Sequence, residues 1–192
     1  MVVIKHAFAL GILFVVYSFN LNTFAQDRYK MNGPTKFEVS GTSSLKNWEM
    51  NSQKGSGTAN IAVENGRINS IEKLSVTLRG ESLKSGTSGM DKNAYNALKT
   101  GQHPVIRFKM EEVLSNRGNV IKIKGDLTVA GVTKTKTFDM QVNNSSESLR
   151  FSGKLDVTFD EFNMTPPTAM WGTIKTGNEL TISFNAVFKP IS

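Results

Sequence analysis

The sequence contains no cysteine, only two histidines and, beyond residue 25, no long hydrophobic run. Without cysteine there can be no disulfide bond, no cysteine nucleophile and no lipid anchor attached through a thiol. Two histidines and no cysteine are also too few for a His/Cys metal site within one chain. We therefore expect no resident metal or cofactor.

Residues for acid–base or nucleophilic chemistry are scarce as well. His103, which precedes Pro104, is the only histidine outside the N-terminal segment, and no GxSxG elbow accompanies it as a Ser-His-Asp hydrolase would require. The neighbouring carboxylates Glu111-Glu112 and Asp160-Glu161 would point to opposite faces of a strand, so neither pair converges. The sequence thus predicts a protein without catalysis. An enzyme that uses His103 with a carboxylate is the alternative.

The N-terminus has the pattern of a secretory signal peptide. Lys5 precedes the apolar run 7–19, and the small residues Thr23 and Ala25 suit cleavage between Ala25 and Gln26. The run is short for a membrane span, so a retained anchor is the weaker interpretation. We expect a periplasmic or secreted protein with one domain over residues 26–192, since this length can bury a core without disulfides.

The chain is basic, with a formal net charge of +7. Its lysines and arginines are spread along the expected strands and turns, and we expect no nucleic-acid partner for an exported protein with this distribution. A transient contact with anionic lipid head groups is the second interpretation of the charge.

Period-two alternation of apolar and polar residues dominates the sequence and predicts β-strands. The clearest case is 125–140, where two alternating runs flank the small-residue turn Ala130-Gly131. Other strand-like runs lie at 36–40, 45–50, 58–63, 74–78, 106–110, 121–123, 149–159 and 180–188, and Asn65-Gly66 is a strong hairpin signal. Residues 26–35 read as a tail.

One short helix is expected, capped by Asp91 and ended by Gly101 before Pro104. Several amphipathic antiparallel strands with one helix indicate an all-β, closed or nearly closed barrel. An outer-membrane barrel, the alternative with the apolar face outward, would need longer strands and aromatic girdles. Lys122 and Lys124 on one alternating face fit water better.

The connection 160–177 is long and rich in apolar residues, among them Phe162, Met164, Met170 and Trp171, with Pro166-Pro167 in the middle. Long loops in compact domains often form lids or binding loops. Two interpretations stay open: the segment plugs one end of the barrel as ordinary core, or it forms a portal.

Four segments together resemble the YceI-like family of bacterial polyisoprenoid-binding proteins. They are SSLKNWEM at 43–50, MDKNAYNALKTGQHPVIRFKM at 90–110, GDLTVAGVTKTKTFDM at 125–140 and FNMTPPTAMWGTIKTGNELTISF at 162–184. The resemblance implies an eight-stranded antiparallel lipocalin-like barrel with an elongated apolar cavity, an isoprenoid ligand and, in some members, a stress-response role. Tyr95, Leu98 and His103 depart from the paired Phe and Asp that many relatives carry near the helix, which affects the cavity's shape there.

The expected function is binding, carriage or storage of a long-chain apolar lipid, such as a polyisoprenoid, polyprenyl phosphate or quinone-like molecule, in a monomer or homodimer. A solid barrel that serves as an interaction module is the alternative. Inward-facing residues and apolar residues of the 160–177 connection are the predicted cavity wall: Phe37, Val39, Trp48, Val76, Ile106, Phe108, Ile121, Ile123, Leu127, Val129, Phe138, Met140, Phe151, Leu155, Val157, Met164, Met170, Trp171, Ile182, Phe184 and Phe188.

Overall fold

The structure, a computed structural model, describes residues 27–145 and 147–191. The predicted signal peptide and its cleavage site at Ala25 lie outside the described residues, and the domain division at residue 26 stays a prediction. Among the helices that are described, none combines the length and the apolar character that a membrane crossing requires.

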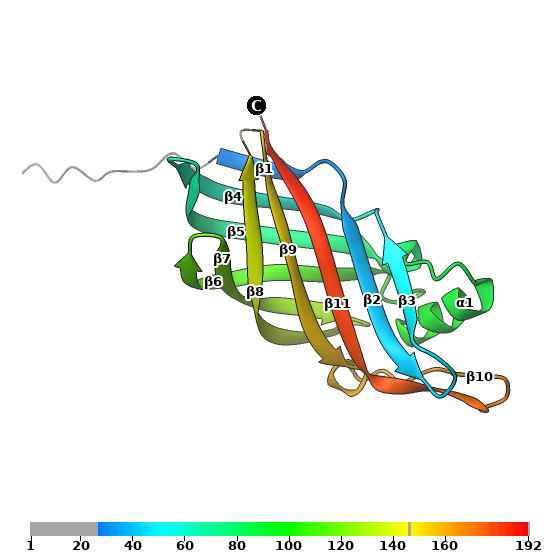
Figure 1. The fold of residues 1–192 in the computed structure, drawn as a ribbon. Helices are drawn as coiled ribbons and strands as arrows, with labels where there is room; N and C mark the ends of the chain where they lie inside the picture. The colour runs from blue at the N-terminus through cyan, green and yellow to red at the C-terminus, as the bar shows by residue number, and fades with distance from the viewer. Residues whose placement is uncertain (1–26, 146, 192) are drawn as a thin grey trace, which may run out of the picture.

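The described chain forms antiparallel strands, one α-helix and two short 3₁₀-helices (Figure 1). In chain order the elements are β1 (Asp27–Met31), β2 (Lys36–Ser43), β3 (Trp48–Ser52), β4 (Ser56–Glu64), β5 (Arg67–Arg79), η1 (Gly80–Ser82), α1 (Ser88–Ala97), β6 (Val105–Arg117), β7 (Val120–Val129), β8 (Val132–Ser145), β9 (Ser148–Thr158), η2 (Asp160–Phe162), β10 (Thr168–Ala169) and β11 (Ile174–Pro190).

Eight of these strands close into a ring. Their order is β1, β4, β5, β6, β7, β8, β9 and β11, and the pairing of β11 with β1 completes the circle. In β7, buried positions alternate with half-buried ones from Val120 to Val129, as one inward-facing and one outward-facing side require. The predicted all-β architecture of eight antiparallel strands with one helix is confirmed.

The ring is closed by a segment that the sequence pattern assigned to a tail. Tyr29 of β1 pairs with Ala59 of β4 and with Pro190 of β11, and its side chain is buried. The tail interpretation of residues 26–35 is therefore wrong. Only Tyr29 and Met31 are apolar in β1, so the alternation is too short to stand out from a polar linker.

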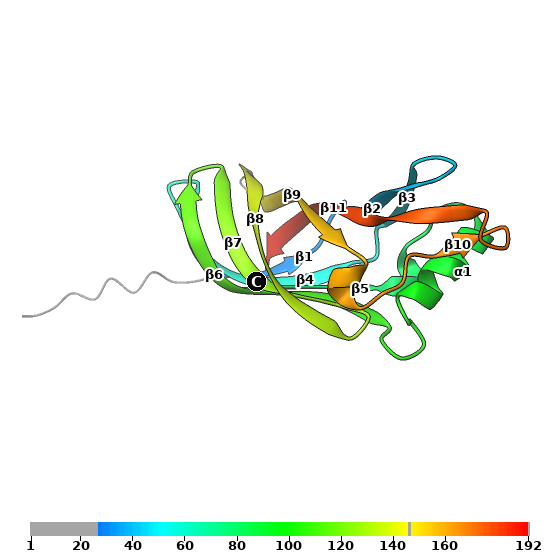
Figure 2. The same ribbon diagram turned by 90° about the horizontal axis from the view of Figure 1, so that it is seen from below.

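The ring is extended at one end by β2 and β3. β2 pairs with β11 from Asn185 back to Thr176, and β3 pairs with β2 on its other side. The loop between β2 and β3, the helix α1 and the β10–β11 hairpin gather at this end, opposite the β6–β7 turn (Figure 2). These three segments surround the end of the barrel.

The helix α1 has other bounds than the sequence indicated. It begins at Ser88, and Asp91 lies buried in its first turn rather than at the N-cap. The Asp91 carboxylate accepts hydrogen bonds from the backbone N–H of Ser85 at 2.8 Å and from its hydroxyl at 2.7 Å. Lys99, with a φ of +53°, takes the left-handed position after the helix that the sequence assigned to Gly101.

Candidate functional site: an apolar cavity at one end of the ring

One half of the ring is filled with side chains. Each of the eight ring strands contributes to this cluster, which consists of Tyr29, Ala59, Ile61, Ile68, Ile71, Leu74, Met110, Ile121, Ile123, Met140, Val142, Leu149, Phe151, Ala186 and Phe188. Within it, the rings of Phe151 and Phe188 meet edge to face with centroids 5.5 Å apart. This filled half is close-packed core, which stabilises the fold and forms the floor of the other half.

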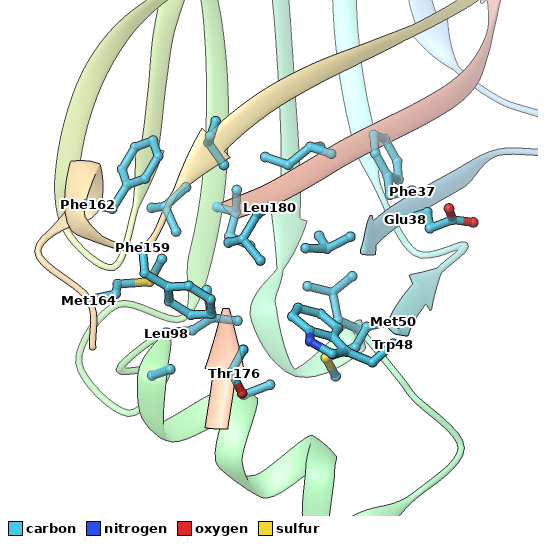
Figure 3. A pocket seen from close by; sticks show the side chains of 18 of the residues that line it. Phe37, Glu38, Trp48, Met50, Leu98, Phe159, Phe162, Met164, Thr176 and Leu180 are labelled. Atoms are coloured by element: carbon cyan, nitrogen blue, oxygen red, sulfur yellow. The ribbon is translucent and has the colours of Figure 1, made fainter. Parts of the chain in front are cut away.

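The other half is hollow. A cavity of about 1010 Å³ lies above the floor and opens toward α1 and β10. Figure 3 shows Phe159, Phe162 and Leu180 on one side of it, and Trp48 and Met50 on the other. Ligand pockets in proteins commonly have volumes of about 300–1,000 Å³, so this chamber is at the large end of that range.

The predicted wall residues, with one exception, line this cavity: Phe37, Val39, Trp48, Val76, Ile106, Phe108, Ile123, Leu127, Val129, Phe138, Met140, Phe151, Leu155, Val157, Met164, Met170, Trp171, Ile182, Phe184 and Phe188. Ile121 does not line it. Ile121 lies two residues along β7 from Ile123, is fully buried in the filled half and pairs with Met140. Contact of any of these side chains with a ligand stays a prediction.

Several residues that line the cavity were not among the predicted wall residues, although their spacing in the sequence indicates an inward-facing position. Leu74 and Leu78 flank Val76 at period-two spacing on β5, and Leu180 precedes Ile182 in the same way on β11. The helix α1 contributes Met90, Ala94 and Ala97, and its C-cap contributes Leu98. These four residues follow the i, i+4, i+7, i+8 spacing of one helix face, which is the signal that identifies them.

Two glycines on the wall make room for aromatic rings. A Cβ atom at Gly41 would lie 2.6 Å from the indole of Trp48, and one at Gly153 would lie 2.8 Å from the ring of Phe184. The pairing of β9 with β11 continues without a shift through Gly153. This glycine therefore leaves space for an aromatic ring and does not form a β-bulge. The absence of a Cβ atom at the two glycines therefore gives space to both rings, which are part of the cavity lining.

Polar side chains concentrate at the mouth. The cavity residues of this kind are Glu38, Ser43, Lys46, Lys92, Asn93, Thr168 and Thr176. The Glu38 carboxylate accepts a 2.7 Å hydrogen bond from the Lys36 ammonium and points away from the apolar wall (Figure 3). Within residues 27–145 and 147–191, neither Lys46 nor Lys92 has an acidic partner within salt-bridge distance, so the mouth carries free positive charge.

The helix at the mouth is held by a polar cluster. The Tyr95 hydroxyl lies 3.0 and 2.9 Å from the carbonyl oxygens of Glu81 and Leu83, and the Lys84 ammonium donates to the same hydroxyl. Burial alone would raise the pKa of the Asp91 carboxyl, but the hydrogen bonds from Ser85 and the nearby Lys84 ammonium outweigh it and lower the pKa. The cluster fixes α1 over the mouth with its apolar face inward.

A second polar cluster holds the segment that carries Phe159, Phe162 and Met164 into the chamber. Glu161 accepts a 2.9 Å hydrogen bond from the Thr158 N–H, and its own N–H donates to the Thr158 hydroxyl at 3.2 Å. This reciprocal pair has the form of a capping box. Lys136 of β8 also donates to Glu161 and is the main reason why the pKa of this carboxyl is lowered.

The lowered pKa of Glu161 predicts that its stabilisation of η2 is lost in acid. Because its folded-state pKa is lowered, its stabilising contribution is complete above the ordinary value of 4.5 and is lost as the pH falls through the lower folded-state value. We expect Glu161→Gln to lower the melting temperature at neutral pH, and this difference from the wild-type protein to shrink below pH 4.5. Thermal unfolding followed by circular dichroism against pH measures both. A difference that is constant with pH would contradict the assignment.

The residues weighed for catalysis do not meet in the cavity. His103 is exposed, lies against the turn at Gly131 and is outside the cavity lining. Glu111 and Glu112 both face Lys124, at 3.4 and 3.1 Å. These two carboxylates therefore converge on one lysine, at a register shift between Met110 and Glu112, and the expectation that they point to opposite faces is wrong. Asp160 accepts a 2.9 Å hydrogen bond from Asn178, whereas Glu161 pairs with Lys136, so the second carboxylate pair diverges as expected.

Different parts of the segment 160–177 have the features of the plug and of the portal that were considered for it. Phe162 and Met164 are buried and form part of the cavity wall, as a plug would. Met170 and Trp171 lie at the tip of the β10–β11 hairpin with exposed side chains, as a portal would have. Both interpretations thus apply, each to one part of the segment.

An antiparallel ring of eight strands with an apolar chamber at one end places the protein in the class of β-barrels that includes the lipocalins. Within that class, the sequence profile of the YceI-like domain matches residues 19–188, and the chain belongs to the YceI-like family. The match begins before the predicted cleavage site. A search of curated protein sequences returned no match.

Solved structures share the fold at low sequence identity. BcnA of Burkholderia cenocepacia is 18% identical with a TM-score of 0.67, over 80% of this chain and 95% of that one. A polyisoprenoid-binding domain from Saccharophagus degradans is 8% identical with a TM-score of 0.64, over 85% and 98%. The YceI protein of Campylobacter jejuni is 20% identical with a TM-score of 0.56, over 72% and 85%.

Proposed function

We propose that this protein binds a long-chain apolar lipid of the polyisoprenoid type in its cavity, and carries or stores it without catalysis. The observation that carries the proposal is a chamber of about 1010 Å³ whose wall is almost entirely apolar. An open chamber favours a ligand-binding role over the solid-barrel alternative. The similar fold of the Saccharophagus degradans domain, which is named for polyisoprenoid binding, supports the ligand class.

The energetics suit such a ligand. Each buried CH₂ group contributes about 0.8 kcal/mol, so a few isoprene units supply roughly 10 kcal/mol before the cost of ordering the chain is subtracted. Binding of this kind requires no polar anchor, because the wall and the isoprenoid are both apolar. The floor formed by Ile123, Met140 and Phe151 limits how far the chain penetrates.

The free lysines at the mouth favour an anionic head group. Lys46 and Lys92 stand where the polar end of a lipid would emerge, and ammonium groups bind phosphate through charge-assisted hydrogen bonds. A polyprenyl phosphate therefore fits better than a neutral, quinone-like molecule. The N-terminal pattern supports a periplasmic or secreted location, where the protein would carry this lipid between membranes or hold it in store.

The proposal predicts that protein purified from its own host without detergent contains bound prenyl lipid. Native mass spectrometry should show an adduct, and solvent extraction of the same sample should identify its chain length and head group. Protein that has been delipidated and then exposed to polyprenyl phosphate should regain the adduct. If neither the native nor the reloaded protein holds a prenyl chain, the proposal is wrong.

A further inference from the structure

The most exposed apolar side chains of the described residues lie together at the cavity mouth. Trp171 is 101% exposed, Leu45 68% and Met170 63%, and all three belong to the cavity lining. The other large exposed apolar side chains in the described ranges, such as Leu114 at 46%, lie elsewhere on the surface and are more covered. Because burying apolar surface is favourable, a fully exposed tryptophan beside a cavity entrance indicates a surface that binds a partner.

The backbone conformation at the tip of the β10–β11 hairpin is a second indication that these exposed side chains have a function. Met170 and Trp171 both have positive φ, 51° and 53°, and the Gly172 N–H donates to the Ala169 carbonyl at 3.1 Å. Positive φ at both central residues is the pattern of a type I′ turn, for which Asn-Gly is the favoured pair, and Gly172 continues the left-handed run with a φ of 88°. Two large side chains there strain the backbone, and strain of this kind is retained where the side chains serve a function.

Three segments join into one continuous rim around the mouth. The Ser44 N–H donates to the Lys175 carbonyl at 2.9 Å, and the Lys175 N–H donates to the Ser44 hydroxyl at 3.0 Å, which ties the β2–β3 loop to the β10–β11 hairpin. The Asn93 amide of α1 donates to the Thr168 carbonyl of β10 at 3.5 Å. Figure 2 shows these three segments at the same end of the molecule.

The rim is also positively charged. Its exposed lysines are Lys46, Lys92 and Lys175, one from each segment. The acidic residue of α1, Asp91, is buried and accepts hydrogen bonds from Ser85, so it does not present its charge at the surface. The rim thus combines a protruding apolar tip with cations around it, the composition of surfaces that bind anionic membranes.

We infer that this rim docks on the surface of an anionic lipid bilayer. The side chains of Met170 and Trp171 insert among the head groups, where tryptophan is favoured, and the three lysines lie over the lipid phosphates. The cavity mouth then opens onto the bilayer, and an apolar chain enters or leaves without crossing water. The inference rests on the proposed function only for this last step, because docking is measurable without any ligand.

Vesicle sedimentation tests the inference directly. Delipidated protein is mixed with vesicles of phosphatidylcholine alone or of equimolar phosphatidylcholine and phosphatidylglycerol. We expect binding to the anionic vesicles, a decrease with added salt, and a blue shift of Trp171 emission. The double variant Met170→Asn, Trp171→Gly should bind about tenfold or more weakly, because it lacks the inserting side chains. The same variant should melt at a higher temperature, since Asn-Gly relaxes the turn.

Two further variants separate charge from apolar insertion and from non-specific effects. Replacing Lys46, Lys92 and Lys175 by glutamine should remove the preference for anionic vesicles. Leu114→Ser removes an exposed apolar side chain that is not part of the rim, and it should bind like the wild-type protein. Since all variants share the same N-terminal segment, differences among them report the substituted positions alone.

Either of two results would overturn the inference. One is wild-type protein that ignores anionic vesicles, and the other is a double variant that binds them as the wild type does. A concentration-dependent dimer that the double variant abolishes, without vesicle binding, would instead assign the rim to a second copy of the chain. Loss of docking with retained prenyl lipid would leave the proposed function intact, so the two claims fail separately.

Discussion

Replacing Ile182 or Val76 by tryptophan is expected to weaken lipid binding strongly while the barrel stays folded. Both side chains are half-buried and line the chamber, one on β11 and the other on β5. A tryptophan at either position places its added volume in open space, so it displaces ligand without forcing apart packed side chains. We expect affinity for a polyprenyl phosphate to fall by about tenfold or more, because each excluded CH₂ removes about 0.8 kcal/mol.

The matched control is Leu114→Trp, which adds the same side chain on β6 at an exposed site outside the cavity lining. It should bind lipid as the wild-type protein does. The measurement is native mass spectrometry of delipidated and reloaded protein, with circular dichroism to show that each variant is folded. Full lipid occupancy in the two cavity variants would show that the ligand does not lie in this chamber.

The sequence predicted which residues share the inner face, because strand periodicity depends only on local order. Alternation assigns Leu127, Val129 and Phe138 to one face of the hairpin, and that face lines the cavity in the structure. The same reasoning does not say where along a strand the interior is filled. Ile121 and Ile123 have the same pattern, yet only Ile123 reaches the cavity, since the difference depends on side chains contributed by the other ring strands.

Prediction from the sequence was also wrong or incomplete where long-range strand pairing decides the structure, and where the residues of a turn do not have the usual preference for its conformation. β1 has too few apolar residues to be recognised, and its place in the ring comes from pairing with β4 and β11. The tip at Met170-Trp171 carries none of the Gly, Asn or Asp residues that mark a type I′ turn at its central positions. Such disagreement between local preference and structure is expected at functional sites.

The contrast between the two halves of the barrel explains how one ring combines a stable core with an open chamber. Packing in the filled half involves all eight ring strands, so strand closure does not depend on the cavity's contents. The hollow half is lined by two smaller apolar clusters, one around Phe162 and the other around Met50, and polar groups centred on Asp91 and Glu161 hold the segments at its end. Stability and ligand binding should therefore respond to different substitutions.

A matched pair of alanine substitutions tests this division. Ile121 is fully buried in the filled half, whereas Ile182 faces the chamber, and both are isoleucines on ring strands. Ile121→Ala should lower the free energy of unfolding by about 2–5 kcal/mol, because it removes packed contacts and leaves a new void. Ile182→Ala should cost less than about 2 kcal/mol, since its side chain already borders open space.

Denaturant unfolding of delipidated protein measures the free energy of unfolding of both variants. Lipid loading measures whether ligand binding responds to the same substitutions. Below its unfolding transition, Ile121→Ala should load polyprenyl phosphate as the wild-type protein does, because it leaves the chamber wall unchanged. Ile182→Ala enlarges the chamber and should also keep its lipid, in contrast to Ile182→Trp. Equal losses of stability at the two positions would mean that the hollow half is packed as tightly as the filled one, and the division would have to be given up.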